Sequence, residues 1–348
     1  MLRVAASAVL VPLLSMVGHE VWELTANLRY PVAPVDGEHT MAAVVYEAHG
    51  PTPEVLKVVR SHPQPLQPPP DGFVVLRVVA AALNPVDFKQ MRNDQPDALA
   101  PKPRIAGFDV SGVVLAAGTS SGFKAGDEVF GMMPLVGSPW GSLAEVTAVD
   151  ASCLALAPRR IPLDEAAALP LVGLTVLQVF SQAGLLPGEE RGEERGEERG
   201  EERREERSEY AGQTMLVHAA AGGVGSFAVQ YARHVLGFGR VIGTCSKRNA
   251  ARVMELGATG TIDYTQTAFE GAMRAVGGAD AVLDPMAWSY MARTLDPSSG
   301  VLRPYAKYCH ILSSDWNENG DEASPLAVLR GPLEKWRRRA IRDRKSVV

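Results

Sequence analysis

Cysteine is scarce in this chain of 348 residues. The three cysteines, Cys153, Cys245 and Cys309, lie far apart, and no C-x-x-C pair occurs. We therefore expect neither a disulfide framework nor a zinc site built from cysteine. The shortage of cysteine also fits a reducing compartment.

A surplus of charge of one sign is also missing outside one segment. The formal net charge is −5, and residues 188–209, with eleven glutamates and six arginines, account for all of it. Nothing in the remaining charge points to nucleic acid or to an acidic membrane surface as a partner. The segment repeats GEER without apolar residues, so it is a solvated helix or a disordered loop. It is either a tolerated surface insertion or an acidic docking segment.

No apolar run is long enough to span a bilayer comfortably. Val4–Val17 is mostly apolar, but it is short, follows a single basic residue and contains Pro12. Residues 1–40 are either a targeting segment or an unstructured extension, and the acidic residues among them disfavour a presequence. The expected location is cytoplasmic, or mitochondrial or plastid if residues 1–40 are a presequence.

The length is sufficient for two domains, and the composition, 46% hydrophobic and 22% charged, is that of a globular enzyme. In residues 41–170, short apolar stretches alternate with glycine-rich and proline-rich connections, which predicts a β-rich domain built as a partly open barrel. The expected strands are residues 42–46, 55–60, 73–82, 105–117 and 128–130, continued by residues 141–146.

Residues 171–313 have a different pattern, in which strands alternate with helices. Before it, Asp164 is expected to cap a helix over residues 165–169. The stretch TMLVHAAAGGVGSFAVQYAR (214–233) predicts a strand, a glycine turn and a helix. This alternation predicts a doubly wound parallel sheet, and hence an α/β protein. The other expected elements are helices over 173–183 and 249–256 and strands over 240–244, 261–263, 281–283 and 308–312.

The glycine turn is the first candidate site. It has the form Ala219-x-x-Gly222-x-x-Gly225, a variant of the dinucleotide fingerprint with alanine in the first position. Free N–H groups and the helix dipole at such a turn favour a diphosphate. Phe227 and Tyr231 follow at helical spacing and are expected to pack inside this domain.

The end of the second strand, TCSKRN (244–249), is the second candidate site. An acid there favours NAD, whereas a basic cluster accommodates the 2′-phosphate of NADP. This segment has no acid and two cations, Lys247 and Arg248, and an arginine can bind phosphate through two N–H groups. NADP is therefore the expected cofactor. The alternative is that both cations are only exposed residues at a helix start.

Several further runs accompany these motifs in a characteristic order: AALNPVDFKQM, GFDVSGVVLAAGTSSGFKAGDEVFG, GSLAEVTAV, AAALPLVGLTVLQ and ELGATGTIDY. Over roughly residues 41–312 the chain resembles the medium-chain dehydrogenase/reductase superfamily, in its zinc-free quinone oxidoreductase branch. It is similar to plant-type 2-alkenal and enone reductases and to mitochondrial quinone-oxidoreductase-like proteins.

This resemblance implies a GroES-like catalytic domain, a Rossmann domain, an active site in the cleft between them, and NADPH as hydride donor. It implies that Asn84, Asp87 and Lys89 lie beside the nicotinamide and that the helix of Thr175 borders it. The implied cofactor residues are Ala219, Gly222, Gly223, Val224 and Gly225 at the diphosphate, and Ser246, Arg248 and Tyr264, with Lys247 beside them, around the 2′-phosphate.

A bound metal is not expected. A catalytic zinc needs about three Cys, His or acidic ligands. Zinc-using relatives place a cysteine in the loop after the long strand and a His-Glu pair after the next glycine. Here residues 84–87 contain no cysteine and residues 107–109 no histidine, so Asp109 is expected to be structural.

The expected reaction is hydride transfer from NADPH to the C=C bond of a small enone or enal, or to a quinone. Without a metal, hydrogen-bond donors must stabilise the developing oxyanion. Lys89 either does this, positions the nicotinamide ribose, or pairs with Asp87 or Asp94. A non-catalytic nucleotide-binding relative is the remaining alternative, because residues 314–348 depart from the family pattern. A homodimer is the family expectation, which the altered C-terminus weakens.

Overall fold

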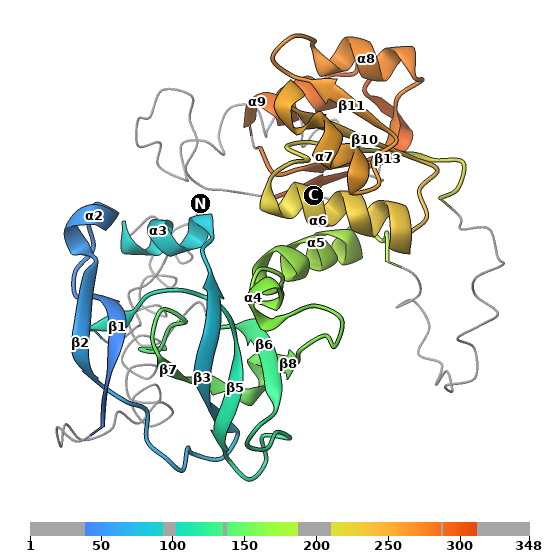
Figure 1. Cartoon of the computed structure of the whole chain (residues 1–348). Coiled ribbons are helices and arrows are strands. Elements are labelled where there is room, and N and C mark those ends of the chain that lie inside the picture. Colours follow the sequence, from blue (N-terminus) through green and yellow to red (C-terminus); the bar gives the residue numbers. More distant parts are fainter. Residues whose placement is uncertain (1–38, 93–101, 135–137, 187–209, 287, 312–348) are drawn as a thin grey trace, which may run out of the picture. The chain divides into compact units, whose positions relative to one another are not determined.

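The computed structural model describes residues 39–92, 102–134, 138–186, 210–286 and 288–311 (Figure 1). The GEER segment (188–209) and the C-terminal tail (314–348) considered above lie outside these residues, as does the possible targeting segment (1–40) apart from residues 39 and 40. The chain divides into two compact units, Met1–Leu171 and Val172–Val348.

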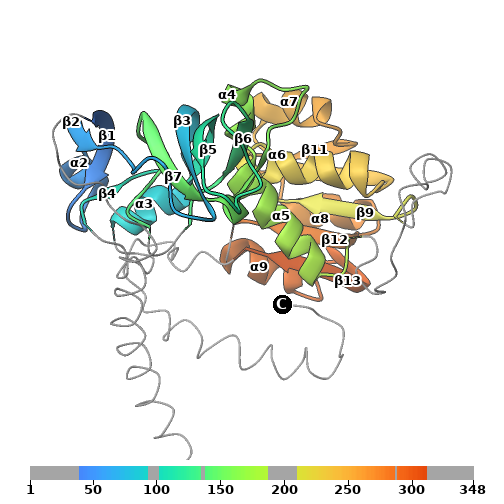
Figure 2. The same ribbon diagram turned by 90° about the horizontal axis from the view of Figure 1, so that it is seen from below.

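The first unit is built from two antiparallel sheets (Figure 2). Apolar side chains of both sheets, among them Val45, Leu76 and Val110, form one buried cluster. The three-stranded sheet has the order β2-β1-β4, and the five-stranded sheet has the order β7-β3-β5-β6-β8. Their bounds are β1 Thr40–Tyr46, β2 Lys57–Pro63, β3 Phe73–Ala82, β4 Arg104–Ile105, β5 Asp109–Ala117, β6 Glu128–Met132, β7 Val146–Asp150 and β8 Leu154–Leu156.

Residues 143–145 connect the two sheets. The N–H of Val44 in β1 donates to the carbonyl of Leu143 at 2.8 Å, and the N–H of Val78 in β3 donates to Glu145 at 3.0 Å. The segment expected to be a strand from residue 141 thus becomes regular only at Val146, where β7 begins. These links close the two sheets into the expected partly open barrel.

Two other expectations for this unit differ from the structure. The strand expected over residues 105–117 is broken, because Gly107 has φ of +93° and a Cβ there would lie 2.3 Å from Ser142 Oγ. Asp164, expected to cap a helix over residues 165–169, instead lies in the first turn of α4 (Leu163–Ala166), whose N-cap residue is Pro162. The unit's other helical segments are α2 (Thr52–Val55), α3 (Pro85–Met91), the 3-10 turn Ala151–Cys153 and the start of α5 (Pro170–Gln182).

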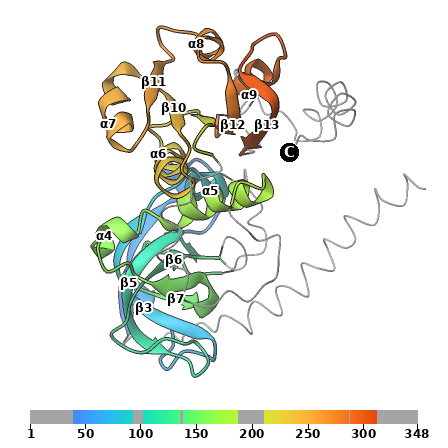
Figure 3. The ribbon, with the colours of Figure 1, turned by 90° about the vertical axis from the view of Figure 1, so that its right-hand side faces the viewer.

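The second unit contains a five-stranded parallel sheet with the order β11-β10-β9-β12-β13 (Figure 3). Each expected strand falls on an observed one, which confirms the doubly wound sheet. The strands are β9 Thr214–Val217, β10 Arg240–Cys245, β11 Gly260–Asp263, β12 Ala279–Asp284 and β13 Leu302–His310. The helices are α6 Gly223–Gln230, continued by a π turn over Tyr231–Val235, α7 Ala250–Glu255, α8 Phe269–Ala275 and α9 Trp288–Leu295, with a 3-10 turn over Lys247–Asn249.

Alternation along β9 assigns the helices to the two faces of this sheet. Met215 and Val217 pack in one buried cluster with residues of α5, α6 and α7, and Phe227 and Tyr231 pack against that cluster as expected. Leu216 packs on the opposite face with Phe269 and other residues of α8. In the part of the chain that the structure describes, no helix is long and apolar enough to cross a membrane.

Candidate functional site

The glycine turn lies at the carboxyl end of β9. Ala219 has a left-handed backbone with φ of +48°, and the Gly222 N–H donates to its carbonyl at 2.9 Å. A Cβ on Gly225 would lie 2.2 Å from that same carbonyl oxygen, so the position requires glycine. A Cβ on Gly222 would make a tight contact with this oxygen, at 3.3 Å, but would meet no other atom within 4 Å, so space is open on its other sides. The first N–H groups of α6 have no carbonyl partner within the helix, and this opening therefore suits an anion.

The sheet order places this turn where ligands of such sheets bind. The chain runs from β9 outward to β10 and β11, and then returns to β12 on the other side of β9. In open α/β sheets, ligands bind outside the carboxyl ends of the strands where the order reverses. The expected diphosphate residues from Ala219 to Gly225 directly follow β9 at this point.

The expected 2′-phosphate residues follow the next two strands. Ser246 precedes the short turn of Lys247 and Arg248, both exposed at the end of β10. Tyr264, 52% exposed, follows β11, whose last residue Asp263 lies opposite Cys245 in register. The structure thus brings Ser246, Lys247, Arg248 and Tyr264 to one edge of the sheet.

Asp263, the last residue of β11, is an acid at this edge for which no role was expected from the sequence. The pKa of Asp263 is lowered mainly by hydrogen bonds that its carboxylate accepts from the Thr265 hydroxyl and N–H. The positive charge of Lys247 lowers this pKa further. The Asp263 carboxylate stays ionised and remains bound to its own turn. Lys247 and Arg248, which follow β10, therefore share this edge with the anionic Asp263.

Thr175 lies on α5, which packs closely against the glycine turn. A Cβ on Gly223 would lie 3.2 Å from Val172 Cγ1, and a Cβ on Gly173 would lie 3.4 Å from the Phe227 ring. Small residues on both helices thus allow the close approach. Thr175 is half-buried one turn further along the same helix.

The expected catalytic residues Asn84, Asp87 and Lys89 lie in the first unit, at the start of α3. Ala82 at the end of β3 pairs with Asp109 at the start of β5, so the Asn84 loop leaves the sheet beside Asp109. Asn84 Nδ2 donates to Asp109 Oδ2 at 2.8 Å, and the Leu171 N–H donates to Asp109 Oδ1 at 2.9 Å. Asp109 is fully buried and holds two segments together, which is the structural role expected for it.

Asp87 closes the first turn of α3. Its Oδ2 accepts a hydrogen bond from the Asn84 N–H at 2.5 Å, as an acid three residues after an N-cap commonly does. Burial raises the pKa of Asp87 to about 6, and it raises the pKa of Asp109 to about 6 as well. Lys89 is 8% exposed on the same helix. The hydrogen bonds of Asn84 and Asp87 thus hold the start of α3 together and attach it to Asp109.

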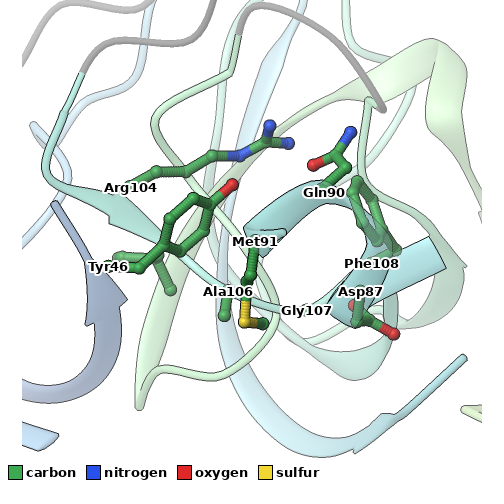
Figure 4. Close-up of a pocket in the computed structure, with 9 residues that line it drawn as sticks. Tyr46, Asp87, Gln90, Met91, Arg104, Ala106, Gly107 and Phe108 are labelled. Carbon is green, nitrogen blue, oxygen red and sulfur yellow. The ribbon is translucent and has the colours of Figure 1, made fainter. Parts of the chain in front are cut away.

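A small pocket adjoins this loop (Figure 4). Asp87 Oδ1 is buried and has no hydrogen-bond partner within reach among the described residues. The Arg104 charge and the backbone N–H groups of Asp87 and Phe108 offset part of the rise in the Asp87 pKa. Lys89 does not line the pocket. The lining residues are Tyr46, Asp87, Gln90, Met91, Arg104, Ile105, Ala106, Gly107 and Phe108.

Two buried residues, His218 and Thr244, lie behind the glycine turn, and no role at the turn was predicted for either. Thr244 lies in β10 and was expected only within the segment 244–249, whereas His218 directly follows β9. The register pairs Val217 with Gly243, which places the following residues, His218 and Thr244, side by side. Within the described ranges, no group of three or more His, Cys, Asp or Glu side chains could hold a metal ion.

Family models match both units. Residues 70–159 match the alcohol dehydrogenase GroES-like domain, and residues 223–310 match the zinc-binding dehydrogenase family. The first unit is therefore a GroES-like domain and the second a Rossmann-type domain.

Whole proteins of known name are similar as well. A quinone-oxidoreductase QR1, chloroplastic, of Triphysaria versicolor is 31% identical over 270 residues, which cover 75% of this chain and 74% of that protein. An NADPH-dependent alkenal/one oxidoreductase, chloroplastic, of Arabidopsis thaliana is 38% identical over 202 residues, covering 57% of this chain and 46% of that protein. The chain thus spans about half the length of the first relatives that it matches.

A solved mycobacterial structure, complexed with NADPH, has a TM-score of 0.59 and 26% sequence identity, covering 83% of this chain and 78% of that one. From these likenesses, the chain belongs to the quinone oxidoreductase branch of the medium-chain dehydrogenase/reductase superfamily. This confirms the family expected from the sequence.

Proposed function

We propose that the protein is an NADPH-dependent oxidoreductase that reduces small enones, enals or quinones without a bound metal. One observation carries the proposal: a turn suited to a diphosphate follows β9, and Lys247 and Arg248 follow the adjacent strand β10. The names of the relatives support it, because one is an NADPH-dependent alkenal/one oxidoreductase and another a quinone oxidoreductase.

The residues present fit the nucleotide. The opening beside Gly222 leaves room for a diphosphate against the N–H groups of α6, and Arg248 with Lys247 would neutralise the 2′-phosphate. When bound, NADPH supplies a hydride for the β-carbon of the substrate. The electron pair of the C=C bond then moves toward the carbonyl oxygen, and a proton from solvent completes the product at the α-carbon.

In the first unit, Lys89 is the proposed residue for the negative charge that develops on the carbonyl oxygen, since its ammonium group supplies three donors. Asn84 is the proposed neighbour of the nicotinamide, and Asp109 holds its side chain in place. Neither role involves a metal. Removal of divalent metals with a chelator should therefore leave the rate of turnover unchanged.

Two assays test the proposal and rank its substrates. The loss of NADPH absorbance is followed with crotonaldehyde and with a naphthoquinone, and thermal stability is measured with and without NADPH. Faster reduction of the enal supports an enone reductase, whereas faster reduction of the quinone supports a quinone reductase. Stabilisation by NADPH without turnover on either identifies a nucleotide-binding relative without catalysis. The absence of both stabilisation and turnover contradicts the proposal.

A further inference from the structure

Thr244 lies behind the glycine turn and is 1% exposed. Its Oγ1 accepts a hydrogen bond from the Ala219 N–H at 3.1 Å, and its carbonyl oxygen accepts from the Ala220 N–H at 2.9 Å. One residue of β10 therefore binds two consecutive N–H groups of the turn. Neither bond was foreseeable from the spacing of the glycines, because both depend on the register between β9 and β10.

His218 is fully buried beside Thr244. Its Nδ1 lies 3.3 Å from Thr244 Oγ1 and its Nε2 lies 3.3 Å from Thr294 Oγ1, while Phe269 and Tyr290 meet the ring edge to face. Burial lowers the pKa of His218 to about 3, so the ring is neutral at physiological pH. A neutral imidazole has one donor and one acceptor, which matches the two hydroxyl groups on either side. The ring therefore fixes the position of the Thr244 hydroxyl.

The turn that Thr244 holds is strained. Ala219 has a φ of +48°, a conformation that costs a residue with a Cβ about 1–2 kcal/mol. Such a conformation persists only where its surroundings over-determine it. The hydroxyl of Thr244 is one of these constraints, since it binds the N–H of the strained residue itself.

We propose that Thr244, supported by His218, is a positioning residue that keeps the turn ready for a diphosphate before any nucleotide arrives. The inference rests on the proposed NADPH-dependent function. Without the hydroxyl, Ala219 relaxes in the free protein, and binding must restore the strained form, which lowers affinity. The diphosphate is common to NADPH and NADH. The loss of affinity is therefore the same for both nucleotides.

The test compares three threonine variants. Thr244→Val removes the hydroxyl and keeps the branched shape, whereas Thr244→Ser keeps the hydroxyl. Thr214→Val is the matched control, because Thr214 is equally buried at the start of β9 and its Oγ1 has no partner among the described residues. Dissociation constants for NADPH and NADH are measured by fluorescence titration, and melting temperatures are measured without nucleotide.

Thr244→Val is expected to raise both dissociation constants about tenfold, the equivalent of one buried hydrogen bond. The dissociation constants of Thr244→Ser should stay within about twofold of the wild-type values, and Thr214→Val should leave both constants unchanged. A lower melting temperature with unchanged dissociation constants would show a merely structural role and overturn the inference. So would a loss confined to NADPH, which would place the effect at the 2′-phosphate.

Two outcomes separate this inference from the proposed function. A wild-type protein that binds neither nucleotide defeats both, whereas tight binding by wild type and Thr244→Val alike defeats the inference alone. If Thr244→Val does not fold, His218→Phe serves instead, because it keeps the Thr244 hydroxyl and removes the ring that orients it. An increase of about threefold in both dissociation constants supports the inference, whereas unchanged dissociation constants contradict it.

Discussion

Replacing Asp87 by asparagine should stabilise the protein at neutral pH. Asp87 is 5% exposed, and its Oδ2 accepts a hydrogen bond from the Asn84 N–H. Its Oδ1 has no hydrogen-bond partner within reach among the described residues, and the N–H groups of Asp87 and Phe108 act only as weaker influences that lower the Asp87 pKa. An asparagine can place its oxygen at the Oδ2 position and keep that bond. The substitution thus removes a buried charge while it retains the contact that closes the first turn of α3.

The size of the effect follows from the pKa. Burial raises the pKa of Asp87 from 3.8 to about 6, so the folded protein holds its proton more tightly than the unfolded chain. Stability therefore falls as pH rises between these two values, and the full loss from one group is about 3 kcal/mol at most. Because Asp109 titrates in the same range, the two carboxyl groups share the effect. We expect Asp87→Asn to gain about 1–3 kcal/mol at neutral pH.

The assay is thermal unfolding of wild type and variant from pH 4 to pH 8. The melting temperature of Asp87→Asn should exceed that of wild type above pH 6, and the difference should vanish near pH 4, where the unfolded carboxyl group also gains its proton. Asp109→Asn is the matched comparison. Both Asp109 oxygens accept hydrogen bonds from N–H groups. The NH₂ group of an asparagine at this position would face one of these N–H donors, so Asp109→Asn should destabilise the protein at every pH. Equal effects of the two variants would refute this reasoning.

Three further predictions concern the second unit. Gly225→Ala should destabilise the protein by about 1–3 kcal/mol in thermal unfolding, because its Cβ would overlap the Ala219 carbonyl oxygen at 2.2 Å. Gly222→Ala, whose Cβ would lie 3.3 Å from the same oxygen, should destabilise it less and should weaken NADPH binding. Equal melting temperatures for the two would contradict this. The ring of His218 should show no protonation between pH 5 and pH 8 in NMR titration, and a midpoint near 6.5 would show that the ring is open to water and contradict its buried position. Arg293→Ala should lower the melting temperature slightly, because Arg293 makes a two-point ion pair with Glu270 and stacks on Phe269, and no change would mean that this exposed pair contributes nothing.

The sequence predicted those elements whose signals are local. The strand over residues 73–82 was expected with both of its ends, because an apolar run stops at Asn84-Pro85. The glycine turn was expected for the same reason, since its glycines lie within four residues of the chain, from 222 to 225.

What the sequence missed depends on packing between distant segments. The break at Gly107 arises from the close approach of Ser142, which is distant in the chain. The early start of α4 is an exception, because its cause, the extended Pro162 directly before it, is local. The bonds of Asp109 and Thr244 come from strand register, which no single stretch of sequence encodes.

The central claim, that the ends of β9 and β10 together bind a phosphorylated nicotinamide nucleotide, is tested most directly by nucleotide titration of wild type and Arg248→Ala. Wild type should bind NADPH more tightly than NADH. Arg248→Ala should weaken NADPH binding about ten- to a hundredfold, as expected for a charge-assisted phosphate contact, and leave NADH binding unchanged. Equal changes for both nucleotides, or no measurable binding of either to the wild type, would contradict the claim.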